Sequence, residues 1–240
     1  RVRSSGVNPA DVKLRSGASN YGYNFPLVIP NSDGAGIVDQ VGFNVPKSLM
    51  NKRVWFFNGQ RLGRAHGSAA EFIALDKNFV TPLADDISFE EGATLGIPAM
   101  TAYHSVFSDG PVSGKVILVT GGSGAVGFYA VSLASWGGAK VIATVSNSNK
   151  AQNAILGGAK ETINYKTEDI ITRVAKLTNG KGVDRIISVD FADSLKWLTN
   201  VISKNGTVVA YASDTNRTPQ IDFFQFMRKN TQIRPFILNS

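Results

Sequence analysis

The chain has 240 residues, a formal net charge of +7, 43% hydrophobic residues and 18% charged residues, which is a globular composition. No apolar run reaches the roughly 18 to 20 residues that cross a bilayer, and no leader-like segment opens the chain, so we expect a soluble protein with the cytoplasm as its default compartment. The absence of cysteine excludes disulfides, thiolate zinc sites and cysteine nucleophiles from this chain. Lys and Arg are scattered rather than clustered among aromatic residues, which argues against a nucleic-acid partner.

The first 85 or so residues contain short strand-like runs separated by Gly, Pro and Asn, a spacing that favours a small barrel or sandwich. These runs are residues 36–41, 53–57, 68–75 and 79–82. Ser88-Phe89-Glu90-Glu91 then predicts a capping box, in which a serine hydroxyl and a carboxylate three residues later satisfy free amides at the start of a helix. We expect the following helical segment to be interrupted near Pro98.

From Lys115 onward, strand-like and helix-like segments alternate, which predicts a parallel sheet covered by helices on both faces. The predicted strands are residues 116–120, 141–145, 162–165, 183–189, 207–212 and 233–238. The predicted helices are residues 125–136, 150–156, 168–177, 194–202 and 223–228. We therefore expect two domains, 1–98 and 99–240. Because the chain opens Arg1-Val2-Arg3 without Met and stops just after an apolar run, we also expect segments to be missing at both ends.

The sharpest local motif is Gly122-Ser123-Gly124-Ala125-Val126-Gly127, a G-x-G-x-x-G pattern. Alone it is a weak signal, but here it ends a predicted strand and opens a predicted helix, as dinucleotide binding requires. We expect Gly122 to permit a tight turn, Gly124 to let the backbone approach a pyrophosphate, and Gly127 to allow close packing of helix on strand. The helix amino terminus would then present free N–H groups to the phosphates.

The end of the second predicted strand indicates which dinucleotide is bound. An Asp or Glu there would bond the ribose 2′-hydroxyl, whereas this chain has Thr144-Val145-Ser146-Asn147-Ser148-Asn149-Lys150. Ser146 and Lys150 can donate to a 2′-phosphate, which favours NADPH over NADH. The alternative is that Lys150 is an ordinary solvated lysine. The glycine spacing also fits short-chain reductases, but none of the 6 tyrosines has the lysine four residues later that their catalysis needs, and this assignment is rejected.

Further short motifs run in order along nearly the whole chain. They are Gly6-Val7-Asn8-Pro9-Ala10-Asp11, Arg15-Ser16-Gly17, Asp33-Gly34-Ala35-Gly36-Ile37-Val38, Val41-Gly42, Ser88-Phe89-Glu90-Glu91-Gly92-Ala93, Thr101-Ala102-Tyr103, the glycine turn, Gly157-Gly158-Ala159, Ile163-Asn164-Tyr165 and Gly180-Lys181-Gly182-Val183-Asp184. Together they resemble the zinc-independent quinone oxidoreductase, or zeta-crystallin-like, family of medium-chain dehydrogenases/reductases. The resemblance implies an α/β protein: a GroES-like β-barrel catalytic domain, incomplete here, followed by a Rossmann doubly wound parallel sheet, with the active site between them.

Metal-using relatives carry a His-Glu pair where this chain has Ser32-Asp33, together with cysteine ligands that are missing here. His66 and His104 are too few and too isolated for a catalytic zinc site, and we interpret them as a loop residue and a helix residue. We therefore expect no metal. Without a Lewis acid, placing nicotinamide against an electron-poor acceptor must supply most of the acceleration.

The resemblance also implies roles for individual residues near the acceptor. Asn8 would lie beside the nicotinamide as a candidate donor to the acceptor oxygen, and Asp11 would line or orient the same pocket. The family often has Tyr two residues beyond Asp11, whereas this chain has Lys13, which is either the donor to the oxyanion or a surface lysine with water as the proton source. Tyr21 and Tyr23 either cover the pocket or are exposed loop residues.

On the cofactor side, the resemblance implies Thr101 beside the nicotinamide ribose and Tyr165 near the 2′-phosphate. It places Ser194 and the stretch 210–213, which ends at Ser213, near the nicotinamide half, in agreement with ligand binding at the carboxyl ends of parallel strands. The strand at 233–238 resembles the edge through which family members form homodimers, and its alternative role is a simple edge strand.

These features predict an NADPH-dependent enzyme that transfers hydride to a quinone or an α,β-unsaturated carbonyl compound without metal. Reduction of enoyl thioesters is a variant of the same chemistry. The alternative from another class is an NADPH-binding structural or regulatory protein with little turnover, crystallin-like or associated with RNA, whose basic residues meet a polyanion.

Overall fold

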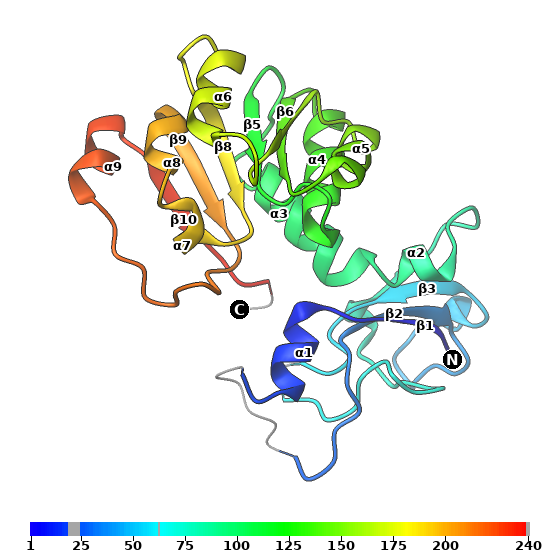
Figure 1. Cartoon of the computed structure of the whole chain (residues 1–240). Coiled ribbons are helices and arrows are strands. Elements are labelled where there is room, and N and C mark those ends of the chain that lie inside the picture. Colours follow the sequence, from blue (N-terminus) through cyan, green and yellow to red (C-terminus); the bar gives the residue numbers. More distant parts are fainter. Residues whose placement is uncertain (19–24, 62, 239–240) are drawn as a thin grey trace. The chain divides into compact units, whose positions relative to one another are not determined.

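The computed structural model describes residues 1–18, 25–61 and 63–238. The chain divides into two compact units, Arg1–Met100 and Thr101–Ser240 (Figure 1). Within the described ranges, no helix is long and apolar enough to cross a membrane. Tyr21 and Tyr23 fall outside the described residues, so their two proposed roles are not addressed by the structure.

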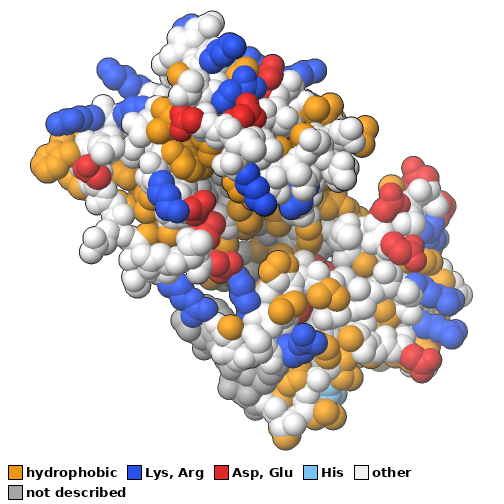
Figure 2. Space-filling model, viewed as in Figure 1, with side chains coloured by type: hydrophobic (Ala, Val, Ile, Leu, Met, Phe, Trp, Pro, Cys, Tyr) orange, Lys and Arg blue, Asp and Glu red, His pale blue; other side chains and the backbone are white. Residues whose placement is uncertain are grey.

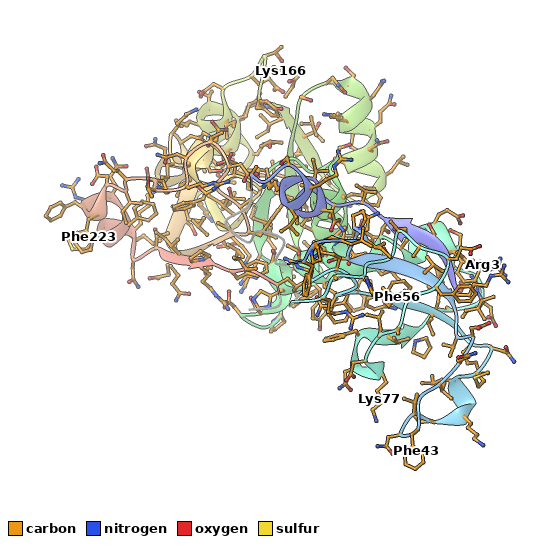
Figure 3. The ribbon with its side chains drawn as sticks, turned by 90° about the horizontal axis from the view of Figure 1, so that it is seen from below. Arg3, Phe43, Phe56, Lys77, Lys166 and Phe223 are labelled. Carbon is orange, nitrogen blue, oxygen red and sulfur yellow. The ribbon has the colours of Figure 1, made fainter. Side chains whose placement is uncertain are left out.

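Unit 1 is built on a four-stranded antiparallel sheet with the strand order β1-β2-β3-β4. Its strands are β1 (Val2–Gly6), β2 (Asp33–Ile37), β3 (Arg53–Phe56) and β4 (Val80–Pro82), with 3₁₀ turns η1 (Lys47–Leu49) and η2 (Lys77–Phe79) between them. Ala35, Leu83 and Ala93 are the centre of its core. Phe56 lies among the strands of this unit, whereas Phe43 projects from the tip of a loop (Figure 3). The expected β-rich amino-terminal half is confirmed.

Two predicted strands of unit 1 need correction. Residues 68–75 do not form a strand, because Ser68 N and Ala69 N donate to Asn31 O and Pro30 O rather than to a neighbouring ladder. The strand predicted at 36–41 is displaced to Asp33–Ile37, where small residues pair with both β1 and β3. The apolar side chains in these two segments do not indicate whether a strand forms, because the hydrogen-bond partners of their backbone lie far away in the sequence.

Helix α1 (Pro9–Arg15) was not among the helices predicted from the sequence. It begins after Asn8, with proline at its first position, where the missing N–H would be unpaired in any case. The Asn8 N–H donates to Asp11 Oδ2 over 2.8 Å, which satisfies an amide at the helix start. An Asn-Pro pair followed three residues later by Asp was therefore the available signal.

The predicted capping box is confirmed at the start of α2 (Phe89–Gly92). Ser88 N donates to Glu91 Oε2 and Glu91 N donates to Ser88 Oγ, over 2.9 and 3.1 Å. The predicted interruption is also confirmed: η3 (Leu95–Ala99) contains Pro98, and Gly96 leaves helical geometry with ψ at −111°. Helix α3 (Met100–Phe107) follows at once.

Unit 2 contains a six-stranded parallel sheet with the order β10-β9-β8-β5-β6-β7. Its strands are β5 (Val116–Val119), β6 (Lys140–Val145), β7 (Glu161–Asn164), β8 (Val183–Ser188), β9 (Ile202–Ala210) and β10 (Gln232–Pro235). The direction of the chain across the sheet reverses between β5 and β8, as in a doubly wound Rossmann fold. The predicted parallel sheet is confirmed, and β10 is one of its edges.

Helices cover both faces of this sheet, because each face is lined by buried apolar side chains that need a partner layer (Figure 1). One core joins the sheet to α3, α4 (Ala125–Trp136) and α5 (Ser148–Leu156). The other joins it to α6 (Ile170–Leu177), α8 (Leu198–Val201) and α9 (Phe223–Lys229). Helix α4 has the same bounds as its prediction.

The helix predicted at 194–202 is wrong as a single element. The chain forms α7 (Phe191–Ser194) and then α8. Trp197 separates them with φ and ψ of −140° and −18°, and its side chain packs against the core. Strand β9 starts at Ile202, five residues before its predicted start at 207, so Ile202 belongs to the strand and not to the predicted helix.

A buried arginine joins three parts of unit 2. Arg185 on β8 is 2% exposed, and its Nη1 donates to the carbonyls of Ser105, over 3.1 Å, and Val106 at the end of α3. Its Nη2 contacts Asp109 Oδ2 at 2.5 Å, and Asp109 also pairs with Arg234 on β10. A cation here satisfies carbonyl groups at a helix carboxyl terminus and compensates a carboxylate at the same time.

Replacing Arg185 with alanine is expected to lower the free energy of unfolding by about 3–5 kcal/mol, because a buried pair loses one partner. Lys196→Ala is the matched control, since it breaks the exposed Lys196–Asp193 pair of the same unit and is expected to have no measurable effect. Urea unfolding of both variants checks this. Equal midpoints for Arg185→Ala and wild type would contradict the assigned role of the buried pair.

Candidate active site

The glycine turn connects the end of β5 to the start of α4. Gly121 has a φ of 62°, so Gly121 is the left-handed residue of the turn. Its N–H donates to Thr144 Oγ1 over 3.2 Å, and Gly122 N donates to Thr144 O over 3.0 Å. The turn is thereby attached to the end of β6.

Each glycine of the motif meets a different constraint. A Cβ on Gly122 would lie 2.6 Å from Ala143 Cβ on β6, and a Cβ on Gly127 would lie 2.1 Å from Gly121 O. Gly122 and Gly127 are therefore required for packing of the turn and the helix. Gly124 is exposed, and a Cβ there would meet only Gly121 O, at 3.3 Å. Its outward face leaves space for another molecule to approach the backbone.

The first turn of α4 offers hydrogen-bond donors beside that space. Gly124 is the helix cap, and Phe128 N is the amide that donates to Gly124 O, over 2.8 Å. The preceding amides of Ala125, Val126 and Gly127 belong to the first turn, where amides have no partner four residues back. Because the helix has 12 residues, its dipole adds partial positive charge here. This arrangement suits an anion such as a pyrophosphate.

The residues predicted to contact a 2′-phosphate lie at the carboxyl ends of two neighbouring strands. Ser146 follows β6 directly, and Tyr165, which is 50% exposed, follows β7 and donates its N–H to Val145 O over 3.1 Å. Lys150 is exposed in the first turn of α5, where its N–H donates to Asn147 Oδ1. The chain from Val145 to Lys160 contains no carboxylate. The structure thus brings these three predicted residues to one edge of the sheet.

The strand order reverses between β5 and β8, and side chains at their carboxyl ends connect the two strands. Thr120 Oγ1 accepts from Val189 N over 2.8 Å, and Thr120 N donates to Ile187 O. Asp190 accepts from Thr215 N and Thr215 Oγ1 over 2.9 and 2.8 Å, and hydrogen bonds from this threonine lower the pKa of Asp190 despite partial burial. The loops after β8 and β9 are therefore held together at the place where doubly wound folds bind ligands.

Three further residues that were predicted to contact the cofactor make hydrogen bonds to neighbouring protein groups. Ser194 is buried and its hydroxyl lies 2.8 Å from Ser188 Oγ. Ser213 Oγ donates to Asn216 O over 2.6 Å. Thr101 is buried in α3, and its carbonyl accepts from Ser105 Oγ. Their assignment to the cofactor stays a prediction.

In unit 1, the predicted residues Asn8 and Asp11 belong to a buried polar cluster with Asp33. Asn8 Nδ2 donates to Asp33 Oδ2 over 2.8 Å, and the Asn8 side chain also donates to the Asp11 carboxylate. Asp33 Oδ2 accepts a second hydrogen bond, from Ile97 N over 2.7 Å. Sequence reasoning missed Asp33 because its partners lie 25 and 64 residues away.

Burial dominates the electrostatics of this cluster. Desolvation raises the pKa of Asp33 to about 6, opposed by its hydrogen bonds from Ile97 and Asn8 and by Arg61, while the charge of Asp11 adds to the increase. Desolvation likewise raises the pKa of Asp11, opposed first by its hydrogen bonds from Asn8. Lys13 follows on α1 and is half-buried.

A cavity of about 770 Å³ lies elsewhere in unit 1, among Ile37, Val54 and Phe72, and its lining does not include Asn8, Asp11 or Lys13. His66 forms an isolated bridge with Ile29 in a loop, and His104 lies on α3 with its ring 4.4 Å from that of Phe236. Among the residues that the structure describes, no three His, Cys, Asp or Glu side chains are close enough to hold a metal ion.

Sequence reasoning also missed residues that support the glycine turn. Thr144 bonds it from β6, and Asn153 on α5 places its Nδ2 at 3.5 Å from Ser123 Oγ. Lys166 follows Tyr165 at the carboxyl end of β7 and is exposed (Figure 3). In the sequence, Lys166 could have been recognised as a candidate because it is a cationic residue directly after Tyr165.

The two units define a protein that joins a GroES-like unit to a Rossmann-type unit. Residues 1–85 match the alcohol dehydrogenase GroES-like domain, and residues 125–240 match the zinc-binding dehydrogenase family. The quinone oxidoreductase of Rattus norvegicus is 32% identical over 210 residues, which are 87% of this chain and 62% of the relative. The human quinone oxidoreductase is 30% identical over 214 residues, 89% of this chain and 63% of the relative.

Solved structures agree with these relatives. The quinone oxidoreductase of Pseudomonas syringae superposes with a TM-score of 0.83 at 29% identity, covering 100% of this chain and 71% of that structure. The Escherichia coli quinone oxidoreductase, solved in complex with NADPH, has a TM-score of 0.82 at 25% identity, covering 98% and 71%. The chain belongs to the quinone oxidoreductase family of medium-chain dehydrogenases/reductases. It spans 62% of the length of the rat relative.

Gly127→Ala is expected to destabilise the ligand-free protein by about 1–3 kcal/mol, because its Cβ would overlap Gly121 O. Gly124→Ala is the matched control within the same motif and is expected to lower the melting temperature much less, since its Cβ would meet only Gly121 O, at 3.3 Å. Thermal unfolding of both variants without ligand checks this difference. A Gly127→Ala protein as stable as Gly124→Ala would show that the turn packs differently.

Proposed function

We propose that the protein reduces quinones or other α,β-unsaturated carbonyl compounds with NADPH and without a metal ion. The observation that carries this proposal is the exposed backbone at Gly124, at the amino terminus of α4 and beside the reversal of strand order. The similarity to quinone oxidoreductases at about 30% identity supports this proposal. The similar Escherichia coli quinone oxidoreductase, which was solved in complex with NADPH, supports it as well. NADPH would supply the hydride.

The nucleotide half of this proposal assigns the pyrophosphate to the amides around Gly124 and the 2′-phosphate to Ser146, Lys150 and Tyr165. The phosphate finds donors there and no carboxylate to repel it. Lys166 adds a second positive charge beside Tyr165. We assign Thr101, Ser194 and Ser213 to the nicotinamide half by family resemblance.

The acceptor half assigns Asn8, Asp11 and Lys13 to the surroundings of the reacting groups, again by resemblance. Zinc does not fit the residues at the family's metal position, because Ser32 and Asp33 stand there and Asp33 Oδ2 is already engaged by two N–H donors. Acceleration would come from orientation and from hydrogen bonds to the developing oxyanion. Lys13 or water supplies the proton in this scheme.

An RNA-associated or crystallin-like role is the second candidate, and the net charge of +7 is the observation in its favour. On the face shown in Figure 2, however, Lys and Arg side chains are spread over the surface and interspersed with Asp and Glu. Binding to a phosphate backbone needs a continuous basic surface. Retention on an RNA column that falls steeply with salt would support this candidate over the enzyme.

The enzyme proposal is tested by acceptor-dependent NADPH oxidation. The whole protein is mixed with NADPH and, separately, with benzoquinones, naphthoquinones, conjugated enones and enoyl thioesters, and absorbance at the reduced nicotinamide band is followed. Oxidation is expected with at least one quinone or enone. No oxidation with any member of the panel would overturn the proposed activity. A rate that depends on added zinc and is lost with chelator would overturn its metal independence.

NADPH at a hundredfold excess over its dissociation constant is expected to stabilise the protein by about 2.7 kcal/mol, and NADH by less at the same concentration. Lys150→Ala is expected to weaken the response to NADPH selectively, because one donor to the 2′-phosphate is removed. Lys160→Ala is the matched control, since Lys160 is exposed directly before β7, at the opposite end of that strand. Thermal shifts measure all six combinations of the three proteins with the two nucleotides, and equal shifts of the wild type with NADPH and NADH would contradict the 2′-phosphate assignment.

A further inference from the structure

The loop that follows β8 in unit 2 is held against the glycine turn. Thr120 Oγ1 accepts a hydrogen bond from Val189 N over 2.8 Å. A Cβ built on Gly121 would lie 3.5 Å from Val189 Cγ1, which is ordinary van der Waals contact, so the Val189 side chain lies alongside the turn. Val189 is also 43% exposed. The start of this loop therefore borders the exposed backbone that we assign to the pyrophosphate.

The next residue, Asp190, joins this loop to the loop that follows β9. Both oxygens of its carboxylate accept from one threonine, Oδ2 from Thr215 N over 2.9 Å and Oδ1 from Thr215 Oγ1 over 2.8 Å. Phe191 N donates to Ala212 O over 2.9 Å beside this pair. Hydrogen bonds to an ionised acceptor are stronger than those between neutral groups. One carboxylate thus connects two loops that are 25 residues apart in the chain.

The loop after β9 has hydrogen bonds of its own, which place Thr215 opposite Asp190. Ser213 Oγ donates to Asn216 O over 2.6 Å, and Asn216 Oδ1 accepts from Thr218 N over 3.0 Å. These contacts flank Thr215 on both sides in the sequence. The threonine is therefore presented on an ordered turn, where both its N–H and its hydroxyl reach the same carboxylate.

The position of this pair at the surface indicates what it contributes. Thr215 is exposed and Asp190 is half-buried. Polar contacts that water can replace add little to the stability of a fold. The pair does, however, determine where two loops lie relative to one another at the carboxyl ends of β8 and β9. We therefore expect its removal to change the order of these loops much more than the stability of unit 2.

These loops belong to the half of the sheet that the adenosine half of the cofactor does not use. A doubly wound sheet has two mononucleotide-binding halves, which meet where the strand order reverses. The glycine turn and the ends of β6 and β7 lie in one half, where the pyrophosphate and the 2′-phosphate are assigned. Strands β8 and β9 lie in the other half, beyond the reversal. By this division, their loops face the second mononucleotide, which in NADPH carries the nicotinamide.

We propose that Asp190 is a positioning residue that joins the loops after β8 and β9 in the ligand-free protein, so that the nicotinamide mononucleotide of NADPH binds to a wall that is already ordered. This inference rests on the proposed function and deepens it. A site that is ordered before binding gains affinity, because the loops lose less conformational entropy when the ligand arrives. Asp190 and Thr215 act through the loops they join, and neither side chain has to contact the cofactor.

Titration calorimetry with a whole and a truncated ligand tests this role. Thr215→Val removes the hydroxyl that donates to Asp190 Oδ1 and keeps the shape of the side chain. The Kd for NADPH is expected to rise about fivefold, while the Kd for adenosine 2′,5′-bisphosphate, which lacks the second mononucleotide, is expected to change by less than about twofold. A general loss of stability would not separate the two ligands. Equal changes for both ligands, or an unchanged Kd for NADPH, would overturn the inference.

The same loop offers a rescue variant and a matched control. Thr215→Ser keeps the hydroxyl and is expected to bind NADPH as the wild type does. Thr218→Val removes a neighbouring hydroxyl, which donates to Asn216 Oδ1 over 3.4 Å and not to Asp190, and is expected to leave the Kd for NADPH unchanged. If Thr218→Val weakens NADPH binding as much as Thr215→Val does, the effect belongs to the loop in general and the role of Asp190 is wrong.

A double-mutant cycle shows whether the two residues act as one unit. Asp190→Asn keeps the shape of the side chain and replaces one accepting oxygen with a donor, so it is expected to weaken NADPH binding at least as much as Thr215→Val. The double variant is expected to bind no more weakly than Asp190→Asn alone, because the interaction is already lost. Additive losses would show that the residues act separately and would overturn the inference.

Amide exchange in the ligand-free protein separates this inference from the proposed function. The Thr215 amide donates to Asp190 Oδ2, so its exchange in ¹⁵N NMR spectra is expected to be slowed in the wild type and faster in Asp190→Asn. Equal exchange in both proteins would overturn the inference whatever the cofactor does. A wild type that binds neither NADPH nor adenosine 2′,5′-bisphosphate would overturn the proposed function, and this inference with it.

Discussion

The contact on which unit 2 depends is the approach of the start of α4 to the turn that precedes it. Gly127 packs against the carbonyl of Gly121 with no space for a Cβ, and Gly122 packs in the same way against Ala143. This approach directs the first turn of the helix at the point where the strand order reverses. A side chain at either position would move the helix axis, and the row of amides would no longer converge on one anion.

Most of unit 2 could be predicted from the sequence because local signals agree with the final structure. Runs of β-branched residues give β5, β6, β7 and β8 within a residue or two, and α4 has the bounds expected from its spacing. Prediction was wrong where one apolar stretch could serve either element. Residues 194–202 have helical spacing, but Trp197 interrupts the helix and Ile202 already belongs to β9.

Unit 1 was less predictable because its strands are defined by partners and not by apolar side chains. The sequence Asp33-Gly34-Ala35-Gly36 has little intrinsic strand preference, yet it pairs with β1 on one side and β3 on the other. The same stretch carries Asp33, whose contacts join Asn8 to Ile97 across long separations in the chain. A local pattern finds Asn8 and Asp11 as candidates, but it cannot show that a third residue holds them.

The buried cluster of Asn8, Asp11 and Asp33 is held together by hydrogen bonds among its own groups. Two carboxylates close to one amide are costly to bury unless each is compensated, and here N–H groups of Asn8 and Ile97, with the nearby Arg61, compensate them. The Asn8 amide and the Asp33 carboxylate thereby hold one another at the start of α1. Under the proposed function, Lys13 and water are the two candidate proton sources, and Lys13 stands where the family often has tyrosine.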